Sequence, residues 1–177
     1  MKKHFPFSSP IFLLHVLIPI LLPLIQCDDL IDQTCKETPF YDLCVNTLEP
    51  ISRSTKTDVK GLAGIMANIL LSNVTDTLNY IQVLIKQTTD QQLEKALANC
   101  AELYIPEVKY NLPQAIDALM KGDYAFANYV ISDAAKEADA CERSFSDSTK
   151  SPLTCRNQLV SNLCDVAVGI LNVLLKS

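Results

Sequence analysis

The sequence has 177 residues, of which 49% are hydrophobic and only four are glycine, so it suits one folded domain with a hydrophobic core rather than a disordered chain. The formal net charge is −5, and it becomes −7 without residues 1–27, since 13 basic and 20 acidic residues then remain. An acidic protein of this kind is a poor partner for nucleic acids and other anionic polymers.

Residues 1–27 have the pattern of a secretory signal peptide. Two lysines open the segment, and an almost uninterrupted apolar stretch follows over 11–25. A membrane span needs about 20 apolar residues, whereas this stretch is shorter and contains Pro19 and Pro23. We therefore expect cleavage after residue 27, secretion, and a mature domain of residues 28–177 with no membrane anchor.

The first predicted elements are two short helices, over residues 30 to about 35 and 40–48. Thr38 is the predicted N-cap of the second helix, and Pro39 would occupy its first position, where a missing N–H is harmless. No alternating strand pattern or tight hairpin turn appears anywhere after the leader. The two helices are expected to form an N-terminal α-helical hairpin.

Two long amphipathic helices are predicted next. The first covers 58–86, where apolar residues recur at steps of mostly three to five. Residues 89–92 (TDQQ) match a capping box that opens the second. Pro106 and Pro113 should kink or break this second helix, which ends at Gly122. Its core face is predicted to hold Leu93, Leu97, Cys100 and Tyr104.

Two further long helices complete the predicted fold. Asp123 caps the first of them, and its core stripe is Phe126, Val130, Ala134, Ala138, Cys141 and Phe145. Ser151 is the predicted cap and Pro152 the first residue of the other, whose stripe is Leu153, Val160, Leu163, Ala167, Ile170 and Leu174. Four such helices joined by short turns bury their stripes as an up-down-up-down four-helix bundle, so the fold class is all-α.

Residue types needed for common catalytic chemistry are missing from the mature chain. His4 and His15 both lie in the leader, so Ser-His-Asp triads, Cys-His pairs and imidazole metal sites are excluded. The four glycines form no phosphate-binding loop, and the helical spacing of the acidic residues indicates solvated outer faces rather than a catalytic carboxylate pair. We expect no enzymatic activity, no cofactor and no metal.

Six cysteines remain after the leader: Cys35, Cys44, Cys100, Cys141, Cys155 and Cys164. An even number in an exported protein predicts disulfides, and no two have the close spacing of a thiolate zinc site. Nine residues of helix place the Cα atoms of Cys155 and Cys164 about 13 Å apart, beyond the roughly 7 Å limit for a bridge. An intermolecular bridge through Cys155 is a separate hypothesis. Asn73-Val74-Thr75 is a glycosylation sequon, with Asn73 expected off the apolar stripe.

The cysteine spacing resembles that of the plant invertase and pectin methylesterase inhibitor family over the whole mature chain. Besides the cysteines, five segments carry the likeness: TCKETP at 34–39, DVKGL at 58–62, KGDY at 121–124, CERSF at 141–145 and LCDV at 163–166. The resemblance implies disulfides Cys35–Cys44 and Cys100–Cys141, so two in all. It also implies that Cys164 is a free buried thiol, whereas Cys155 departs from the family pattern.

Three regions of the chain bear on the target that the resemblance implies. Family members that block invertase resemble one another in a Pro-Lys-Phe triplet between the second and third long helices, whose lysine reaches acidic groups in the sucrose pocket. The matching residues here are Tyr124, Ala125 and Phe126. Ala125 has no ammonium group, and a charge-assisted contact is worth about 1.5 to 3 kcal/mol. Residues 122–124 and 163–165 resemble pectin methylesterase inhibitors, whereas 112–116 resemble invertase inhibitors.

The resemblance therefore implies a secreted inhibitor in the apoplast, rather than the vacuole, that occludes the cleft of a cell-wall pectin methylesterase in a one-to-one complex. Acid invertase, cell-wall or vacuolar, is the alternative target, and a non-inhibitory pollen or storage protein is the second alternative. A lipid-binding bundle would need a sizeable internal cavity. Besides the triplet, the candidate contacts with the target are Lys109, Asp117, Asp133, Lys136 and Asp139. An acidic surface favours a basic or neutral partner, with binding that changes near wall pH.

Overall fold

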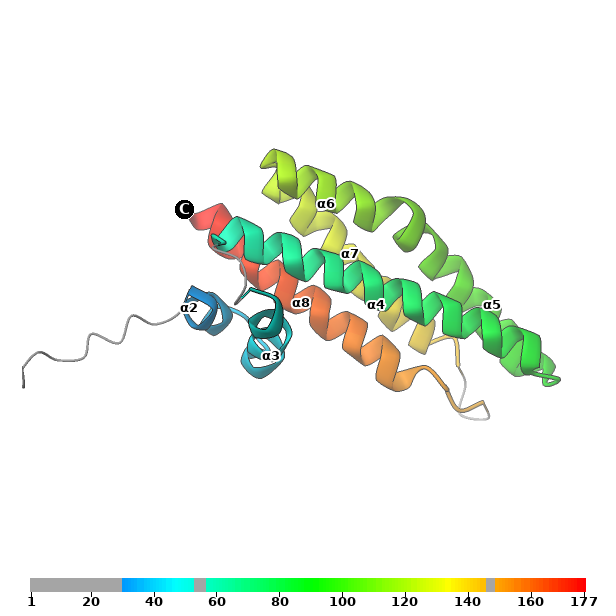
Figure 1. Cartoon of the computed structure of the whole chain (residues 1–177). Helices are drawn as coiled ribbons and strands as arrows, with labels where there is room; N and C mark the ends of the chain where they lie inside the picture. Colours follow the sequence, from blue (N-terminus) through cyan, green and yellow to red (C-terminus); the bar gives the residue numbers. More distant parts are fainter. Residues whose placement is uncertain (1–29, 53–56, 146–148) are drawn as a thin grey trace, which may run out of the picture.

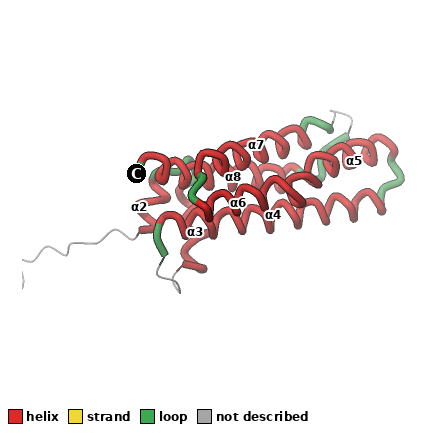
Figure 2. Tube along the Cα trace, turned by 90° about the horizontal axis from the view of Figure 1, so that it is seen from above, coloured by secondary structure: helices red, strands yellow, loops and turns green. Residues whose placement is uncertain are grey.

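The structure, a computed structural model, describes residues 30–52, 57–145 and 149–177, so the predicted leader 1–27 lies outside the described residues. Every regular element in these ranges is a helix (Figure 2). The elements are α2 (Leu30–Lys36), α3 (Tyr41–Ser52), α4 (Val59–Gln87), α5 (Gln91–Pro106), η2 (Glu107–Asn111), α6 (Leu112–Lys121), α7 (Tyr124–Glu142) and α8 (Thr154–Lys176).

Four long rods form the body of the molecule: α4, the continuous α5–η2–α6, α7 and α8. They lie side by side and alternate in direction, so the predicted up-down-up-down bundle is confirmed (Figure 1). The most extensive packing joins α7 to α8. The short helices α2 and α3 pack on each other and on α4 and α8, at the end of the bundle that carries the C-terminus.

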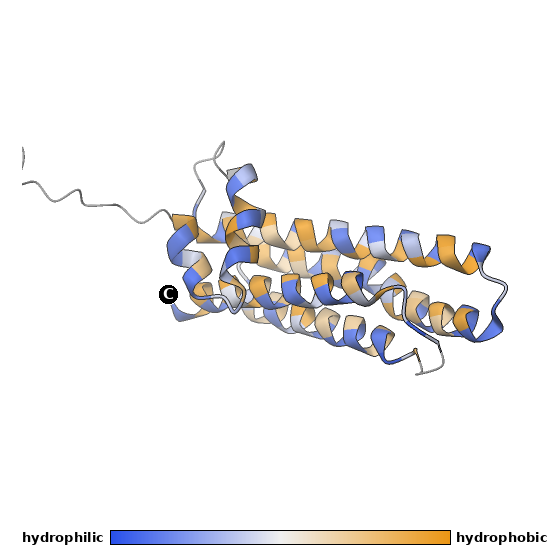
Figure 3. Cartoon of the chain, turned by 90° about the horizontal axis from the view of Figure 1, so that it is seen from below, coloured by the Kyte–Doolittle hydropathy of each residue, from blue (hydrophilic) through white to orange (hydrophobic). Residues whose placement is uncertain are grey.

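One hydrophobic core runs through the whole bundle. Apolar and polar residues alternate along each helix (Figure 3), and the buried apolar side chains of the helices form a single cluster. Helix α8 is long and apolar enough to cross a membrane by composition alone. Its apolar residues instead pack against α4 and α7, so it is the central helix of the bundle core.

Two disulfides tie the helices together, as the resemblance implied. Cys35–Cys44 joins α2 to α3 with a Cα–Cα distance of 5.5 Å, and Cys100–Cys141 joins α5 to the end of α7 with a distance of 4.6 Å. The remaining two cysteines among the described residues, Cys155 and Cys164, are unpaired, the former exposed and the latter buried.

The predicted start of the hairpin's second helix was wrong. Helix α3 begins at Tyr41, and the first bond of its backbone runs to the carbonyl of Phe40. Pro39 therefore precedes the helix, and Thr38 does not cap it. Instead, the Thr38 hydroxyl donates to the Cys35 carbonyl at the end of α2, at 2.8 Å. Hydroxyl side chains serve backbone groups at either end of a turn, so residue type alone does not fix the helix start.

Two other predicted caps were displaced as well. Helix α5 is capped by Asp90, not Thr89, because the Asp90 carboxylate accepts bonds from two amides of the first turn at 2.8 and 3.3 Å. Helix α8 begins at Thr154, beyond Pro152. The Ser151 hydroxyl accepts a bond from the Leu153 amide at 3.1 Å, within the turn before the helix. Short polar side chains compete for these positions.

The predicted core stripe of α7 was one residue out of register in its first half. Ala127 and Ile131 are buried, whereas Phe126 is exposed and Val130 only half-buried. Ala134, Ala138 and Cys141 are buried as predicted, whereas Phe145 lies beyond the end of α7 and is only half-buried. Apolar residues occupy two adjacent registers in this half of the helix, and the smaller alanine fits the tight contact with α8. The large aromatic side chain is therefore left on the surface.

A break at the two prolines was one of the expectations from the sequence. The rod α5–η2–α6 is nevertheless continuous. The structure forms a π-helical turn, η2, directly after Pro106, and Pro113 lies in the first turn of α6. In this turn the Leu112 amide donates to the carbonyl of Glu107, five residues earlier. The wider turn accommodates residues that cannot continue ordinary α-helical bonding.

Glycine is required where the hairpin lies on α8. A Cβ atom at Gly169 would lie 2.9 Å from the Cγ2 atom and 3.0 Å from the Cα atom of Thr38. Carbon atoms do not approach so closely without displacement of the backbone. The hairpin therefore owes its close contact with the bundle to the missing side chain at position 169.

Candidate functional site

Three features fix the turn between α6 and α7. This turn holds the triplet matched to the family motif. Gly122 ends α6 in the left-handed conformation, with φ at 88°, which glycine adopts at no steric cost. The Asp123 carboxylate caps α7 by accepting a bond from the Phe126 amide at 3.1 Å. From α4, the Lys60 ammonium donates to the Met120 carbonyl at 2.9 Å.

Within the triplet, the structure separates a buried part from an exposed part. Tyr124 is half-buried and packs against the hydrophobic core. Ala125 is exposed, and the Phe126 side chain is 41% exposed. The turn therefore presents an aromatic ring to solvent, next to an alanine that offers no charge.

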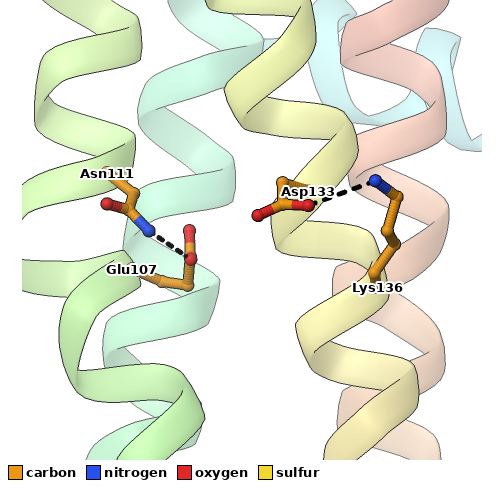
Figure 4. Close-up of polar contacts among 4 residues, drawn as sticks. All are labelled: Glu107, Asn111, Asp133 and Lys136. Carbon is orange, nitrogen blue, oxygen red and sulfur yellow. Dashed lines mark hydrogen bonds and ion pairs between the residues drawn. The ribbon is translucent and has the colours of Figure 1, made fainter.

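The outer surface of α7 continues from Phe126 in a single row. Phe126, Tyr129, Asp133 and Lys136 follow one another at steps of three, four and three, so they lie on one side of the helix. The Tyr129 side chain is 67% exposed. The Lys136 ammonium pairs with the Asp133 carboxylate at 3.1 Å (Figure 4). This exposed pair contributes little to stability, so both groups are available to a partner.

The neighbouring rod adds a third exposed aromatic residue. Tyr110 lies in η2 and is 59% exposed. The next residue, Asn111, lies at about the same height along the bundle as Asp133 of α7 (Figure 4). Both α6 and η2 pack on α7. On α6, the Asp117 carboxylate pairs with the Lys121 ammonium at 2.6 Å.

We call this surface the α6–α7 face. It is defined by seven residues: Tyr110, Asp117, Lys121, Phe126, Tyr129, Asp133 and Lys136. Three of the predicted contacts, Asp117, Asp133 and Lys136, thus lie on the same pair of packed helices as Phe126. Lys109 is exposed on η2 beside this face.

Asp139, another predicted contact, is separated from the α6–α7 face. It lies on the flank of α7 that is directed toward α8, where burial and then the charge of Asp139 raise the pKa of Asp165. On the same flank, the Asn128 amide donates to the Asn172 side-chain oxygen of α8 at 3.0 Å. A partner that covered the α6–α7 face would leave Asp139 at the edge of the contact.

Tyr110 and Tyr129 were missed as candidate contacts by the sequence analysis. The predicted register of α7 put Phe126 in the core, so the row that Phe126 and Tyr129 form was not recognised. Tyr110 follows Pro106, where a break in the helix had been expected. The available signal was an aromatic residue at a position that helical spacing assigns to the polar side of its helix.

A buried polar network holds the other end of the bundle together. The Tyr104 hydroxyl donates to the Asn157 side-chain oxygen at 2.7 Å, and the Asn157 amide donates to the Glu142 carboxylate at 2.7 Å. Glu142 also accepts bonds from the Thr154 hydroxyl at 2.6 Å and the Ser151 hydroxyl at 3.0 Å. Burial raises the pKa of the Tyr104 phenol. The network links α5, α7 and α8 and so supports the helices that carry the face.

The described residues show no arrangement suited to catalysis or metal binding. No group of three or more metal-ligating side chains occurs among them, and none of them is a histidine. The Cys164 thiol is buried, and its burial raises its pKa, which disfavours the reactive thiolate. Asn73 is half-buried within α4, where its amide donates to the Ile69 carbonyl at 2.9 Å; its glycosylation stays a prediction.

A shallow apolar groove lies on the α4 side of α6. It has a volume of about 580 Å³, and its walls include Ile51, Gly64, Ile69 and Met120. The groove opens to solvent along one side of the bundle. It is a surface feature, unlike the internal cavity that a lipid-binding bundle would need.

Comparison with known proteins agrees with this picture. The family model described as "Plant invertase/pectin methylesterase inhibitor" matches residues 29–170. "Cell wall / vacuolar inhibitor of fructosidase 1" of Arabidopsis thaliana is 35% identical over 80% of this chain and 67% of that relative. "Pectinesterase inhibitor" of Actinidia deliciosa is 33% identical over 82% of this chain and 79% of its own length. "Putative invertase inhibitor" of Platanus acerifolia is 30% identical over 95% of this chain and 97% of that protein.

The fold is also similar to solved structures. A crystal structure of a mutant form of an Arabidopsis pectin methylesterase inhibitor superposes with a TM-score of 0.69, at 24% identity, over 80% of this chain and 95% of the other. The match of the family model covers most of the chain, and its relatives are named as inhibitors of enzymes. The chain therefore belongs to the plant invertase/pectin methylesterase inhibitor family, and it is an enzyme inhibitor rather than an enzyme.

Proposed function

We propose that this protein is secreted, and that it inhibits a plant cell-wall pectin methylesterase by laying the α6–α7 face across the active-site cleft in a one-to-one complex. The observation that carries the proposal is the presence of three exposed aromatic side chains on adjacent elements, Phe126 and Tyr129 on α7 and Tyr110 on η2. In this proposal residues 1–27 are removed on export and the mature domain acts in the apoplast.

The composition of the face suits protein recognition. Aromatic residues dominate the binding energy of interfaces when charged residues surround them and exclude water. Here the ion pairs Asp117–Lys121 and Asp133–Lys136 flank the aromatic rings. The face also lies on packed helices tied by the Cys100–Cys141 disulfide, so little conformational entropy is lost on docking.

The choice between the two target enzymes depends on Ala125. The family motif for invertase recognition places a lysine at this position in the α6–α7 turn, and the exposed Ala125 leaves no cation there. Lys121, the nearest preceding cation, lies at the end of α6, on the other side of Gly122 from Ala125. An enzyme pocket that requires a cation at the tip of the turn would therefore be poorly served, which favours pectin methylesterase.

Acid invertase is the second candidate target. It is favoured by the 35% identity to a protein named as an inhibitor of fructosidase and by the likeness of residues 112–116 to invertase inhibitors. These residues lie at the start of α6, where Leu112 and Ala115 are buried. They do not replace the missing cation in the turn.

A titration distinguishes the two targets. The purified mature domain is added in steps to a plant pectin methylesterase and, separately, to an acid invertase, both at mildly acidic pH. We expect pectin methylesterase activity to fall to a plateau at one equivalent of protein while invertase is unaffected. Inhibition of invertase alone would establish the second candidate, and inhibition of neither enzyme at micromolar protein would contradict both.

A further inference from the structure

A buried carboxyl group lies between the rod α5–η2–α6 and α7. Glu107, the first residue of the π-helical turn η2, is only 3% exposed. Its Oε1 atom accepts a bond from the Asn111 amide at 2.6 Å (Figure 4). Its Oε2 atom is fully buried and has no hydrogen-bond partner. Such an unpaired oxygen is costly to bury when it carries charge.

The surroundings of Glu107 add negative rather than positive charge. From α7, Glu137 and Asp133 act on it, and Asp133 has its own partner, the largely exposed Lys136. From α8, the buried Cys164 thiol is near enough for the Glu107 charge to act on it. The other elements that pack on η2 are α4, α5 and α6. Their acidic residues Asp76, Glu94, Glu102 and Asp117 are exposed to solvent.

An ionised Glu107 carboxylate would therefore lose its hydration, and the neighbouring negative charges would repel it. A neutral carboxylic acid keeps the bond from Asn111 to Oε1 and leaves only an unpaired hydroxyl, which is less costly than an unpaired charge. The site lies in a π-helical turn, a feature that is frequent at functional positions. The backbone at this point has already departed from regular α-helical bonding.

We propose that Glu107 is a proton-operated latch, which in its neutral form lets η2 pack against α7 and in its ionised form loosens that contact. The latch is a property of the fold and does not depend on the target enzyme. If the proposed function holds as well, the latch adjusts the α6–α7 face, because Tyr110 lies in the same turn as Glu107.

The direction of the pH effect follows from the surroundings. Burial, and then the charges of Glu137 and Asp133, raise the pKa of Glu107 above its ordinary value of 4.5, and the Asn111 bond offsets only part of this. The native state thus binds a proton more tightly than the unfolded state. The stabilisation is fully present below pH 4.5 and is lost as the pH rises through the native pKa.

The first test needs no variant. The mature domain labelled with ¹³C in its glutamate side chains is titrated by NMR, and the Cδ signal of Glu107 is followed. We expect a titration midpoint clearly above 4.5. A midpoint at or below 4.5 would overturn the proposal, since the buried group would then carry its charge without penalty.

The second test follows the contact itself. Hydrogen exchange of the η2 amides is compared between the wild type and Glu107→Gln at several pH values, with Glu102→Gln, an exposed neighbour in α5, as the matched control. The ratio of wild-type to variant exchange rates should be flat below pH 4.5. It should then rise by up to about tenfold per pH unit, the limit for one released proton. A ratio for Glu107→Gln that stays as flat as that for Glu102→Gln would refute the latch.

Discussion

Removing the Cys100–Cys141 disulfide, by Cys100→Ala together with Cys141→Ala, is expected to lower the free energy of unfolding by about 4 kcal/mol. The bridge closes a loop with a sequence separation of 41 residues, which spans α6 and most of α7. Opening this loop enlarges the unfolded ensemble, and it frees α5 from the end of α7. Urea denaturation of the mature domain measures the difference directly.

The other disulfide is the matched comparison. Cys35–Cys44 closes a loop of only 9 residues in the hairpin, so the same double alanine change there should destabilise by about 2.6 kcal/mol. Both cysteine pairs are fully buried, so the two double alanine changes should lose similar amounts of buried side-chain packing. A larger loss from the hairpin pair than from Cys100–Cys141 would contradict the view that the second bridge holds the bundle together.

The double change Phe126→Ala and Tyr129→Ala is expected to weaken inhibition of the target enzyme by about 30-fold or more. A hot-spot residue of an interface costs about 2 kcal/mol or more when it is truncated, and every 1.4 kcal/mol is about tenfold in affinity, so a loss of about 30-fold corresponds to one hot spot among the two residues. Both side chains lie outside the core, so the free energy of unfolding should stay within about 0.5 kcal/mol of the wild type. The inhibition constant and the urea midpoint are measured on the same preparations.

Val83→Ala provides the control for this experiment. Val83 is 46% exposed on α4, similar in exposure to Phe126, but it does not belong to the α6–α7 face. Its loss should leave the inhibition constant unchanged. If Val83→Ala weakened inhibition and the aromatic double variant did not, the enzyme would bind a different side of the bundle.

The bundle itself was predictable from the sequence, because helical periodicity and caps act over short distances. The spacing of apolar residues along 58–86 reproduced α4 almost residue for residue, and Gly122 and Asp123 have the expected roles at helix ends. The disulfides were implied by the family resemblance, because cysteine spacing alone does not determine which pairs come together.

The details of the face were less predictable, because they depend on contacts between helices. Phe126 and Ala127 are both apolar, and only the close packing of α7 on α8 decides that the alanine is buried. Similarly, two prolines predict a break, whereas the rod, which packs on α4 and α7 at η2, stays continuous through a π-helical turn. The buried position of Glu107 follows from that turn and has no signature in the local sequence.

The most direct measurement of the central claim is hydroxyl-radical footprinting of the mature domain, free and saturated with the enzyme that it inhibits. Tyr110, Phe126 and Tyr129 should lose reactivity in the complex, because the enzyme covers the α6–α7 face. Tyr41, which is exposed on α3, a helix that packs on α4 and α8 and not on α6 or α7, should remain as reactive as in the free protein. Protection of Tyr41 with unchanged reactivity of Phe126 and Tyr129 would contradict the account.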